Sequence, residues 1–204
     1  MRVLVTREEL VARVEALGHD AVFCELIRIE PLGDAPVDAR AYDWLVVTSR
    51  NGAHELARRG VTANRIAAIG PATADALESH GLRVDLVAGT HTQEGLRDEL
   101  PEGTLLLAAA EGARRDVLNA DFLPLYRTIE LRPDVPDADL ALLMSGSAAR
   151  ALAATGARPA VVAIGPQTAA ETRAAGLEVV AVASTHDLEG LVEAVRSRSW
   201  SSPS

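Results

Sequence analysis

Lysine is absent from this chain, and all twenty of its basic residues are arginine. Without lysine the chain cannot form a Schiff base, anchor pyridoxal phosphate or carry the lysine of a Walker phosphate loop. The glycine-rich GxGxxG pattern of dinucleotide-binding proteins is missing as well. Aromatic residues make up only 3% of the chain, so platforms on which bases or flavins could stack are scarce. Several large classes of cofactor-dependent enzyme are therefore excluded.

Cysteine is nearly absent too. The single Cys24 excludes an intrachain disulfide, and its apolar surroundings, AVFCELI, predict a buried thiol rather than a nucleophile. There is no HExxH motif or paired histidine spacing, so we expect no metal site. No apolar run approaches the ~18 residues of a membrane span, and the opening MRVLVTR has a strand pattern rather than that of a signal peptide. We expect a soluble cytoplasmic protein.

Negative charge dominates the composition. The formal net charge is −9 and the pI is near 5.0. Nucleic acids and anionic membranes do not attract a net anion, so neither is expected as a partner. A locally cationic cleft is still compatible with this total.

The chain repeats itself. Residues 68–100 align with residues 163–195 at a shift of 95, with 16 identities in 33 positions. Just upstream, residues 43–60 align with residues 139–156 at a shift of 96. A period this long does not fit a solenoid repeat. The repeat predicts two similar α/β domains that face each other across a cleft.

Short apolar runs alternate with helical patterns, which predicts βα units and parallel sheets. The predicted strands are 2–6, 21–27, 44–48, 66–69, 84–87, 104–109, 140–144, 161–164 and 179–182. The predicted helices are 7–17, 51–59, 72–80, 93–100, 112–119, 147–155, 167–175 and 188–197. Several of these helices are followed by a glycine suited to a C-cap, such as Gly60 and Gly156.

Two segments look like crossings between the domains. Residues 30–40 are rich in Pro, Gly and Asp, and residues 125–137 join a strand-like run to two prolines. The fold class we predict is α/β, with two similar three-layer parallel-sheet domains joined by a two-stranded, hinge-like linker. One domain is discontinuous and the other is inserted into it. The predicted ranges are 1–33 with 128–198 for the discontinuous domain, 37–125 for the inserted domain, and 199–204 for a flexible tail.

Four strand-to-helix junctions share one chemical style. They read TSRNG at 48–52, IGPATA at 69–74, SGSAA at 145–149 and IGPQTA at 164–169. Each places a hydroxyl and free backbone N–H groups beyond the carboxyl end of a parallel strand, where ligands bind in open α/β sheets. Such helix ends attract anions, although ordinary helix capping explains each Ser or Thr as well. If several of them face one cleft, they suit a ligand with many carboxylates.

Two further residues are candidates from their position alone. Arg7 directly follows a predicted strand and is well placed for a cleft. Tyr126 is one of only two tyrosines, and it lies at a predicted crossing. It is either a packing aromatic there or a hydrogen-bond donor to the cleft, and both interpretations stay open.

Taken in order, these motifs resemble the uroporphyrinogen-III synthase family. The segments that carry the resemblance are VLVTR (3–7), DWLVVTSRNGA (43–53), AIGPATADAL (68–77), LYRTIEL (125–131), AIGPQTA (163–169) and THDLEGLVEAV (185–195). The resemblance covers nearly the whole chain. It implies two α/β domains joined by a two-stranded connector, a substrate held between them, and no cofactor. The segment before Tyr126 is shorter than the family pattern, so the inserted domain is expected to be trimmed.

The resemblance also implies a reaction and a set of residues. Hydroxymethylbilane would lose water to give an azafulvene, pass through a spiro intermediate, and close to uroporphyrinogen III with its terminal ring inverted. Tyr126 and Thr73 match positions expected at the departing hydroxyl and are the candidate catalytic residues. The candidate substrate-binding residues are Ser49, Ser145, Thr168, Arg7 and Asn51, and for the last two no role is assigned.

The main alternative is a non-catalytic tetrapyrrole-binding or regulatory homologue of the same fold. A looser one is a two-lobed module that binds another small acid. For the enzyme, the expected partners are hydroxymethylbilane and, as a candidate, the upstream hydroxymethylbilane synthase. We expect a monomer that binds neither nucleic acid nor membrane.

Overall fold

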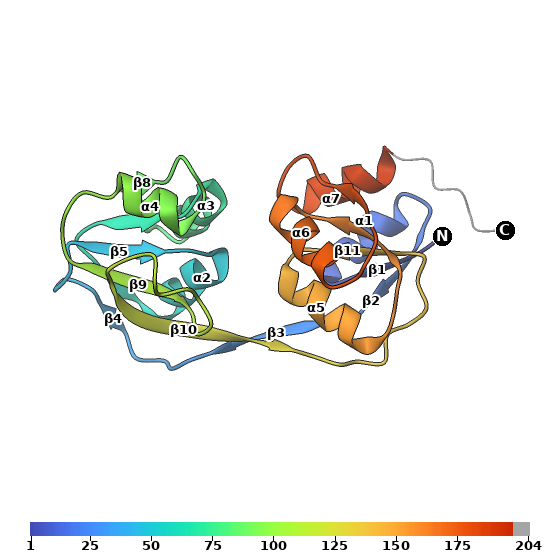
Figure 1. Ribbon diagram of the computed structural model, residues 1–204, viewed down its shortest axis with the longest axis horizontal. Coiled ribbons are helices and arrows are strands. Elements are labelled where there is room, and N and C mark those ends of the chain that lie inside the picture. The colour runs from blue at the N-terminus through green and yellow to red at the C-terminus, as the bar shows by residue number, and fades with distance from the viewer. Residues whose placement is uncertain (198–204) are drawn as a thin grey trace. The chain divides into compact units, whose positions relative to one another are not determined.

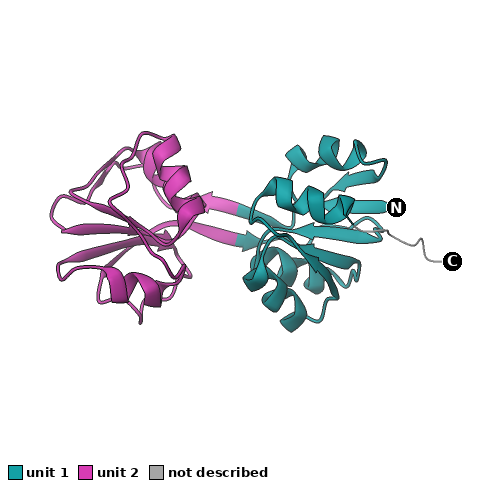
Figure 2. Cartoon of the chain, turned by 90° about the horizontal axis from the view of Figure 1, so that it is seen from above, with its two compact units in different colours: residues 1–28, 129–204 teal, residues 29–128 magenta. Residues whose placement is uncertain are grey.

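The computed structural model describes residues 1–197, and these form two compact units (Figure 1). Unit 1 contains residues 1–28 and continues from residue 129, and unit 2 contains residues 29–128 (Figure 2). The sequence-based ranges place the borders at 33, 37, 125 and 128 instead. The predicted tail, 199–204, lies outside the described residues.

Unit 1 is built on a sheet of five parallel strands in the order β13-β12-β11-β1-β2. The strands are β1 (Arg2–Val5), β2 (Asp20–Phe23), β11 (Leu140–Leu143), β12 (Ala160–Ala163) and β13 (Val179–Val182). The central strands β1 and β11 have almost no exposed side chain, as expected for a parallel sheet that is covered on both faces.

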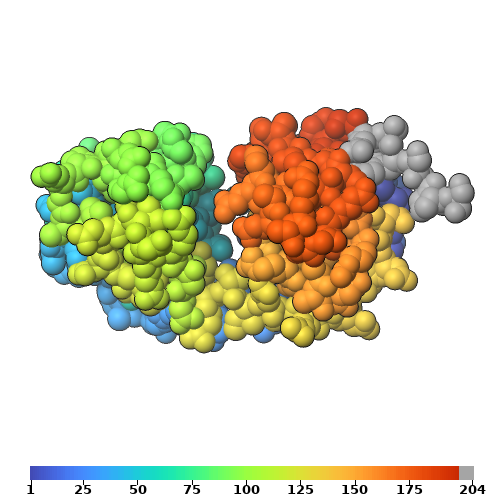
Figure 3. All heavy atoms as spheres, in the orientation of Figure 1, coloured from blue at the N-terminus to red at the C-terminus, as the bar shows by residue number. Residues whose placement is uncertain are grey.

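Helices cover both faces of this sheet. They are α1 (Val11–Glu15), which follows the short 3-10 helix η1 (Glu8–Leu10), and α5 (Gly146–Thr155), α6 (Pro166–Ala174) and α7 (Leu188–Arg196). Val3 and Val5 pack in one buried cluster with residues of α1 and α7, whereas Leu4 packs in another with residues of α5. Successive strand residues thus point to opposite layers. In Figure 3 the orange and red atoms of α5 to α7 form a closed surface on the visible face of unit 1.

Unit 2 has a six-stranded sheet in the order β3-β10-β9-β5-β7-β8. Its strands are β3 (Ile27–Pro31), β5 (Trp44–Val47), β7 (Ile66–Ala68), β8 (Leu86–Val87), β9 (Leu105–Ala110) and β10 (Asp121–Glu130). The pairs from β10 to β8 are parallel. A separate parallel pair is formed by β4 (Val37–Asp38) and β6 (Val61–Thr62).

Unit 2 also has helices on both faces of its sheet. They are α2 (Arg50–Arg59), α3 (Pro71–Ser79) and α4 (Gln93–Glu99). Leu45 and Val47 of β5 pack in one buried cluster with residues of α2 and α3. Trp44 and Val46 of the same strand pack in another cluster with Leu96 of α4. Each unit is therefore an α/β/α sandwich.

The chain passes between the units inside two neighbouring strands, β3 and β10. The amide of Leu32 donates to the carbonyl of Leu125, and that of Leu131 donates to Leu26. From Leu26 to Leu32 the chain runs forward along β3, while the bonded partners run backward from Leu131 to Leu125. The strands β3 and β10 are therefore antiparallel.

One predicted helix is wrong. Residues 112–119 form turns and bends rather than a helix. Arg114 pairs with Glu94 at 2.7 Å, the guanidinium of Arg115 lies 3.9 Å from the ring centroid of Phe122, and Leu118 is buried. These contacts lie with α4 and β10, so tertiary packing overrides the local helical pattern.

Two other predicted elements differ in extent. The strand predicted over 21–27 is interrupted, because β2 ends at Phe23 and β3 begins at Ile27. The helix predicted over 7–17 opens as a 3-10 turn and becomes α-helical only from Val11 to Glu15. Within residues 1–197, no helix combines the length and the apolar character needed to cross a membrane.

Candidate functional site

Ser49 follows the carboxyl end of β5 and is the N-cap of α2. Its backbone is extended, and its Oγ accepts a hydrogen bond from the amide of Gly52 at 3.0 Å. This is the N-cap geometry predicted from the TSRNG junction. The same Oγ lies 2.9 Å from the phenol oxygen of Tyr126, so this cap is bonded to a second strand.

Tyr126 lies in β10 and is only 5% exposed. Its phenol is hydrogen-bonded to Ser49. Burial raises the pKa of the Tyr126 phenol, and interactions with the side chains of Ser49 and Asn51 act in the opposite direction. The phenol is therefore protonated at neutral pH and available as a hydrogen-bond donor.

Thr73 belongs to the second junction of unit 2. After β7, Gly70 is the N-cap of α3, Pro71 is its first residue and Thr73 its third. Thr73 is only 4% exposed, and among residues 1–197 its hydroxyl has no hydrogen-bond partner. A Cβ at Gly70 would come within 3.0 Å of the ring of His91, so this imidazole lies against the start of α3.

Unit 1 repeats both junctions with other partners. Ser145 is the N-cap of α5, and its Oγ accepts from the amide of Ala148 at 3.2 Å. The second contact of this Oγ is the hydroxyl of Ser147, at 3.0 Å. Thr168 is the third residue of α6 and is 7% exposed, and its carbonyl accepts from the Thr172 hydroxyl at 2.6 Å.

Arg7 follows the carboxyl end of β1 and directly precedes η1. Its side chain is exposed, and it forms no ion pair with any residue in the described part of the chain. Its place at the carboxyl edge of the unit 1 sheet, near the strand that leads to Ser145, follows from the pairing of β1 with β11.

The predicted residues thus fall into two sets. A direct hydrogen bond joins Ser49 to Tyr126 in unit 2, and Asn51 lies in the first turn of α2, next to this pair. Within residues 1–197, no side-chain hydrogen bond joins Thr73 to that group, or Arg7, Ser145 and Thr168 to one another.

Sequence reasoning missed a carboxylate at the start of α5. A Cβ at Gly146 would overlap the carboxylate of Glu171, so this acid lies against the first residue of the helix. Arg150 bonds the same carboxylate at 2.6 Å. The signal was present in the repeat, because the positions that match Gly146 and Glu171 in the other copy are Arg50 and Ala76.

Two expectations concern other chemistry. Cys24 is buried as predicted, and burial raises the pKa of its thiol. A buried, protonated thiol is a poor nucleophile. In the described range, no three His, Cys, Asp or Glu side chains gather in a way that could hold a metal ion.

Comparison with known proteins agrees on one family. The family model described as uroporphyrinogen-III synthase HemD matches residues 8–193. A protein of Archaeoglobus fulgidus named "putative uroporphyrinogen-III synthase" is 33% identical over 107 residues, which cover 50% of this chain and 45% of that protein. The match therefore spans less than half of that relative's length.

Among solved structures, the fold is similar to a mutant uroporphyrinogen III synthase from the extremely thermophilic bacterium Thermus thermophilus. The TM-score is 0.70 and the identity 18%, over 97% of this chain and 98% of that one. At this identity the similarity supports the α/β fold. The family model itself covers most of the chain, and the chain belongs to the uroporphyrinogen-III synthase family.

Proposed function

We propose that this chain converts hydroxymethylbilane to uroporphyrinogen III, with inversion of the terminal pyrrole ring and loss of water. The observation that carries the proposal is the buried Tyr126 phenol, which is hydrogen-bonded to the N-cap Ser49 at 2.9 Å. It combines a proton donor with a helix N-terminus at the carboxyl edge of a parallel sheet, where α/β proteins bind ligands. Family membership supplies the reaction class.

The first chemical step needs a donor at the departing hydroxyl. The electron pair of a pyrrole nitrogen drives the C–O bond open, the nitrogen loses its proton, and hydroxide leaves as water. Because burial raises the pKa of Tyr126, the phenol stays protonated and stabilises the leaving oxygen by donating a hydrogen bond. Ser49 holds the phenol in position for this role by its hydrogen bond, and Asn51 is proposed to assist it. Thr73 is proposed as a second contact at the same oxygen.

The carboxylates of the substrate need partners other than lysine. We propose that Ser49, Ser145 and Thr168 bind them together with backbone N–H groups at their helix ends, where the helix dipole favours anions. Arg7 supplies a cation at the edge of the unit 1 sheet. In this proposal the two units are the two domains of the enzyme, and the substrate binds in a cleft between them.

Spontaneous closure of hydroxymethylbilane gives the unrotated type I isomer, so the enzyme has to control conformation rather than supply a strong acid or base. Enclosure by two domains would exclude water from the azafulvene. We further propose that the chain acts in the cytoplasm as a monomer, and that it can receive its substrate from the upstream hydroxymethylbilane synthase.

The proposal is tested with hydroxymethylbilane freshly generated by its synthase. The product is oxidised, and the type III and type I isomers are separated and counted. We expect mostly type III with the chain present and type I without it. Tight binding of the bilane without type III product would favour the regulatory homologue. A chain that neither binds the bilane nor forms type III product would overturn both proposals.

A further inference from the structure

A cavity of about 520 Å³ lies within unit 2, away from the predicted site residues. Tyr42 in its wall precedes β5, and Asp121 begins β10. Arg59, also in the wall, is the last residue of α2, which begins at the opposite, carboxyl edge with Ser49. The cavity is therefore at the amino edge of the sheet, and none of the predicted site residues lines it.

Arg59 brings a cation to this cavity without an anion to balance it. Its Nε donates to the carbonyl of Ala35 at 2.7 Å, which fixes the guanidinium. Its Nη1 has no hydrogen-bond partner but is enclosed, so a ligand in the cavity would have to meet another part of the guanidinium. No carboxylate in residues 1–197 pairs with this guanidinium. The adjacent Arg58, by contrast, pairs with Asp34 and Glu55. An unmatched guanidinium favours binding of an anionic group.

Asp121 brings the opposite charge. Its carboxylate accepts a hydrogen bond from the Tyr42 phenol at 2.8 Å, but within the described residues no arginine pairs with it. The other acid of the wall, Asp38, is already bound by Arg40 at 2.6 Å. Asp121 is thus the free anion of the cavity.

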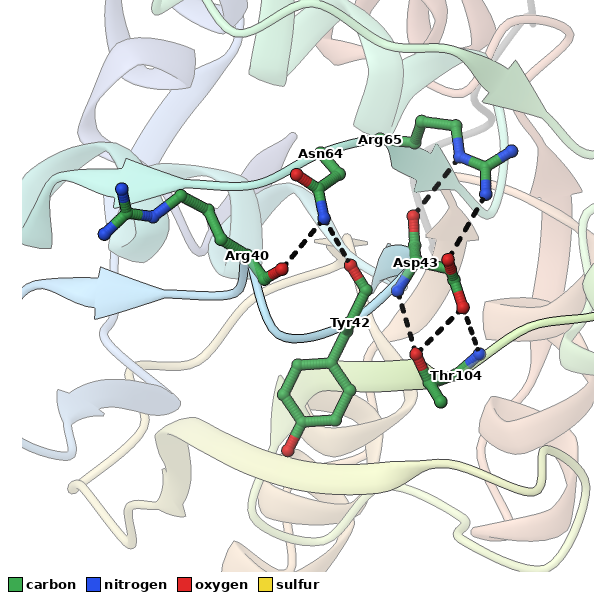
Figure 4. Close-up of polar contacts among 6 residues, drawn as sticks. All are labelled: Arg40, Tyr42, Asp43, Asn64, Arg65 and Thr104. Carbon is green, nitrogen blue, oxygen red and sulfur yellow. Dashed lines mark hydrogen bonds and ion pairs between the residues drawn. The ribbon is translucent and has the colours of Figure 1, made fainter.

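The wall that carries Tyr42 is held in place by a polar network (Figure 4). Asn64 donates to the carbonyls of Arg40 and Tyr42, both at 2.9 Å. The amide of Thr104 donates to the carboxylate of Asp43 at 2.8 Å. Figure 4 shows the ring of Tyr42 pointing away from this network. The phenol that holds Asp121 is therefore preorganised, which lowers the cost of ordering a ligand.

The rest of the lining includes apolar side chains, among them Val37, Leu106 and Leu123. A ligand with only an anionic group would be repelled by Asp121, and one with only a cationic group by Arg59. The volume lies in the range of about 300–1,000 Å³ that small-molecule sites occupy. We propose that this cavity binds a free α-amino acid with an apolar side chain, its carboxylate on Arg59 and its ammonium on Asp121.

The test uses the intact chain and L-leucine as the probe, with calorimetry or NMR titration as the measurement. Two analogues each lack one charge: 4-methylpentanoate has no ammonium, and 3-methylbutylamine has no carboxylate. We expect saturable binding of leucine with a Kd on the order of 1 mM, and binding of each analogue weaker by about tenfold or more. The assay does not depend on the proposed catalytic activity.

Two substitutions assign the charges. Arg59→Gln should weaken leucine binding about tenfold and leave 3-methylbutylamine unaffected, whereas Asp121→Asn should weaken leucine and leave 4-methylpentanoate unaffected. Arg58→Gln is the matched control on the same helix turn, and it should bind leucine as the unmodified chain does. Circular dichroism and thermal melting verify that each variant is folded. If Arg59→Gln does not fold, Asp121→Asn alone still tests the proposal.

Three results would overturn the proposal. They are no saturable binding of leucine up to ~20 mM, equal affinity for leucine and a single-charge analogue, and leucine binding that folded Asp121→Asn leaves unchanged.

Discussion

The two units share a plan but use it differently at their helix starts. In both, a serine caps the helix after a central strand, with Ser49 in unit 2 and Ser145 in unit 1. In unit 2 the capping hydroxyl also bonds the buried Tyr126, while in unit 1 its second partner among residues 1–197 is the neighbouring Ser147. Both copies keep the cap, but only the copy in unit 2 has a buried phenol from a distant strand bonded to it, as far as residues 1–197 show. A shared cap alone therefore does not distinguish the two junctions.

The helix pairs that stand beside these caps differ as well. In unit 2, Nδ1 of His54 on α2 lies 2.8 Å from Nε2 of His80 at the end of α3. Arg150 occupies the position that matches His54, and it pairs with Glu130 at 2.9 Å and with Glu171 at 2.6 Å. Unit 2 thus has a pair of imidazoles where unit 1 has ion pairs of Arg150 with two glutamates. One of these glutamates, Glu171, also lies against the start of α5.

The largest effect is expected from Tyr126→Phe. The ring keeps its packing, but the hydroxyl that faces Ser49 is lost. If Tyr126 assists departure of the substrate hydroxyl, kcat for type III product should fall about 100-fold while KM changes little. Steady-state kinetics with freshly generated hydroxymethylbilane measure both constants.

A melting curve of the same variant is the control, since a purely structural role of the hydrogen bond to Ser49 predicts lower stability with normal turnover. Unchanged kcat in a folded Tyr126→Phe protein would make Tyr126 a core aromatic and move the chemistry elsewhere.

Much of the fold could be predicted from local patterns. Apolar runs, capping serines and terminal glycines such as Gly60 and Gly156 mark the βα units, because each acts within a few residues. The helix predicted over 112–119 is wrong because this segment makes contacts with α4 and β10. Such contacts cannot be read from the local sequence. The long strand β10 was only partly predicted, and Pro124 within it accompanies a shift of register.

The candidate site was predictable as a set of residues but not as contacts. The caps at Ser49 and Ser145 follow from residue type and spacing. The bond between Ser49 and Tyr126 joins residues 77 apart, and it depends on β10 pairing beside β9. The contact of Glu171 with Gly146 is non-local as well. A comparison of the two copies indicates it, because both residues differ from their counterparts in the other copy.

The next effect compares the two caps through Ser49→Ala and Ser145→Ala. Each removes one N-cap hydrogen bond, so each should lower the free energy of unfolding by about 1 kcal/mol. Only Ser49→Ala also frees the Tyr126 phenol, and its kcat should fall about tenfold further than that of Ser145→Ala. Urea unfolding and the type III assay give the two quantities. Equal losses of kcat would mean that the Tyr126 contact adds nothing to turnover.

A smaller effect is expected at Gly146, where a Cβ would displace Glu171 and weaken its bond to Arg150. Gly146→Ala should therefore lower the free energy of unfolding. In the Glu171→Ala background, which places at this position the residue type of Ala76 in the other copy, the loss should disappear. A double-mutant cycle of unfolding free energies with a coupling near zero would contradict this account.

The smallest effect is the response of unit 2 to acid. Asp38, Asp43 and Glu94 all lie in unit 2, and each has a lowered pKa. Arg40 is the main cause for Asp38, the amide of Thr104 for Asp43, and Arg114 for Glu94.

A folded-state pKa below the unfolded value stabilises the fold above the unfolded pKa, near 4, and this contribution is lost as pH falls through the folded pKa. Unit 2 should therefore lose stability below about pH 4. Because these carboxyls are exposed, the loss should be modest and should shrink further in high salt. Hydrogen-exchange mass spectrometry at neutral and acid pH, corrected for intrinsic rates, measures it in unit 2. Asp43→Asn should reduce this acid loss, and a loss that the substitution leaves unchanged would refute the assignment.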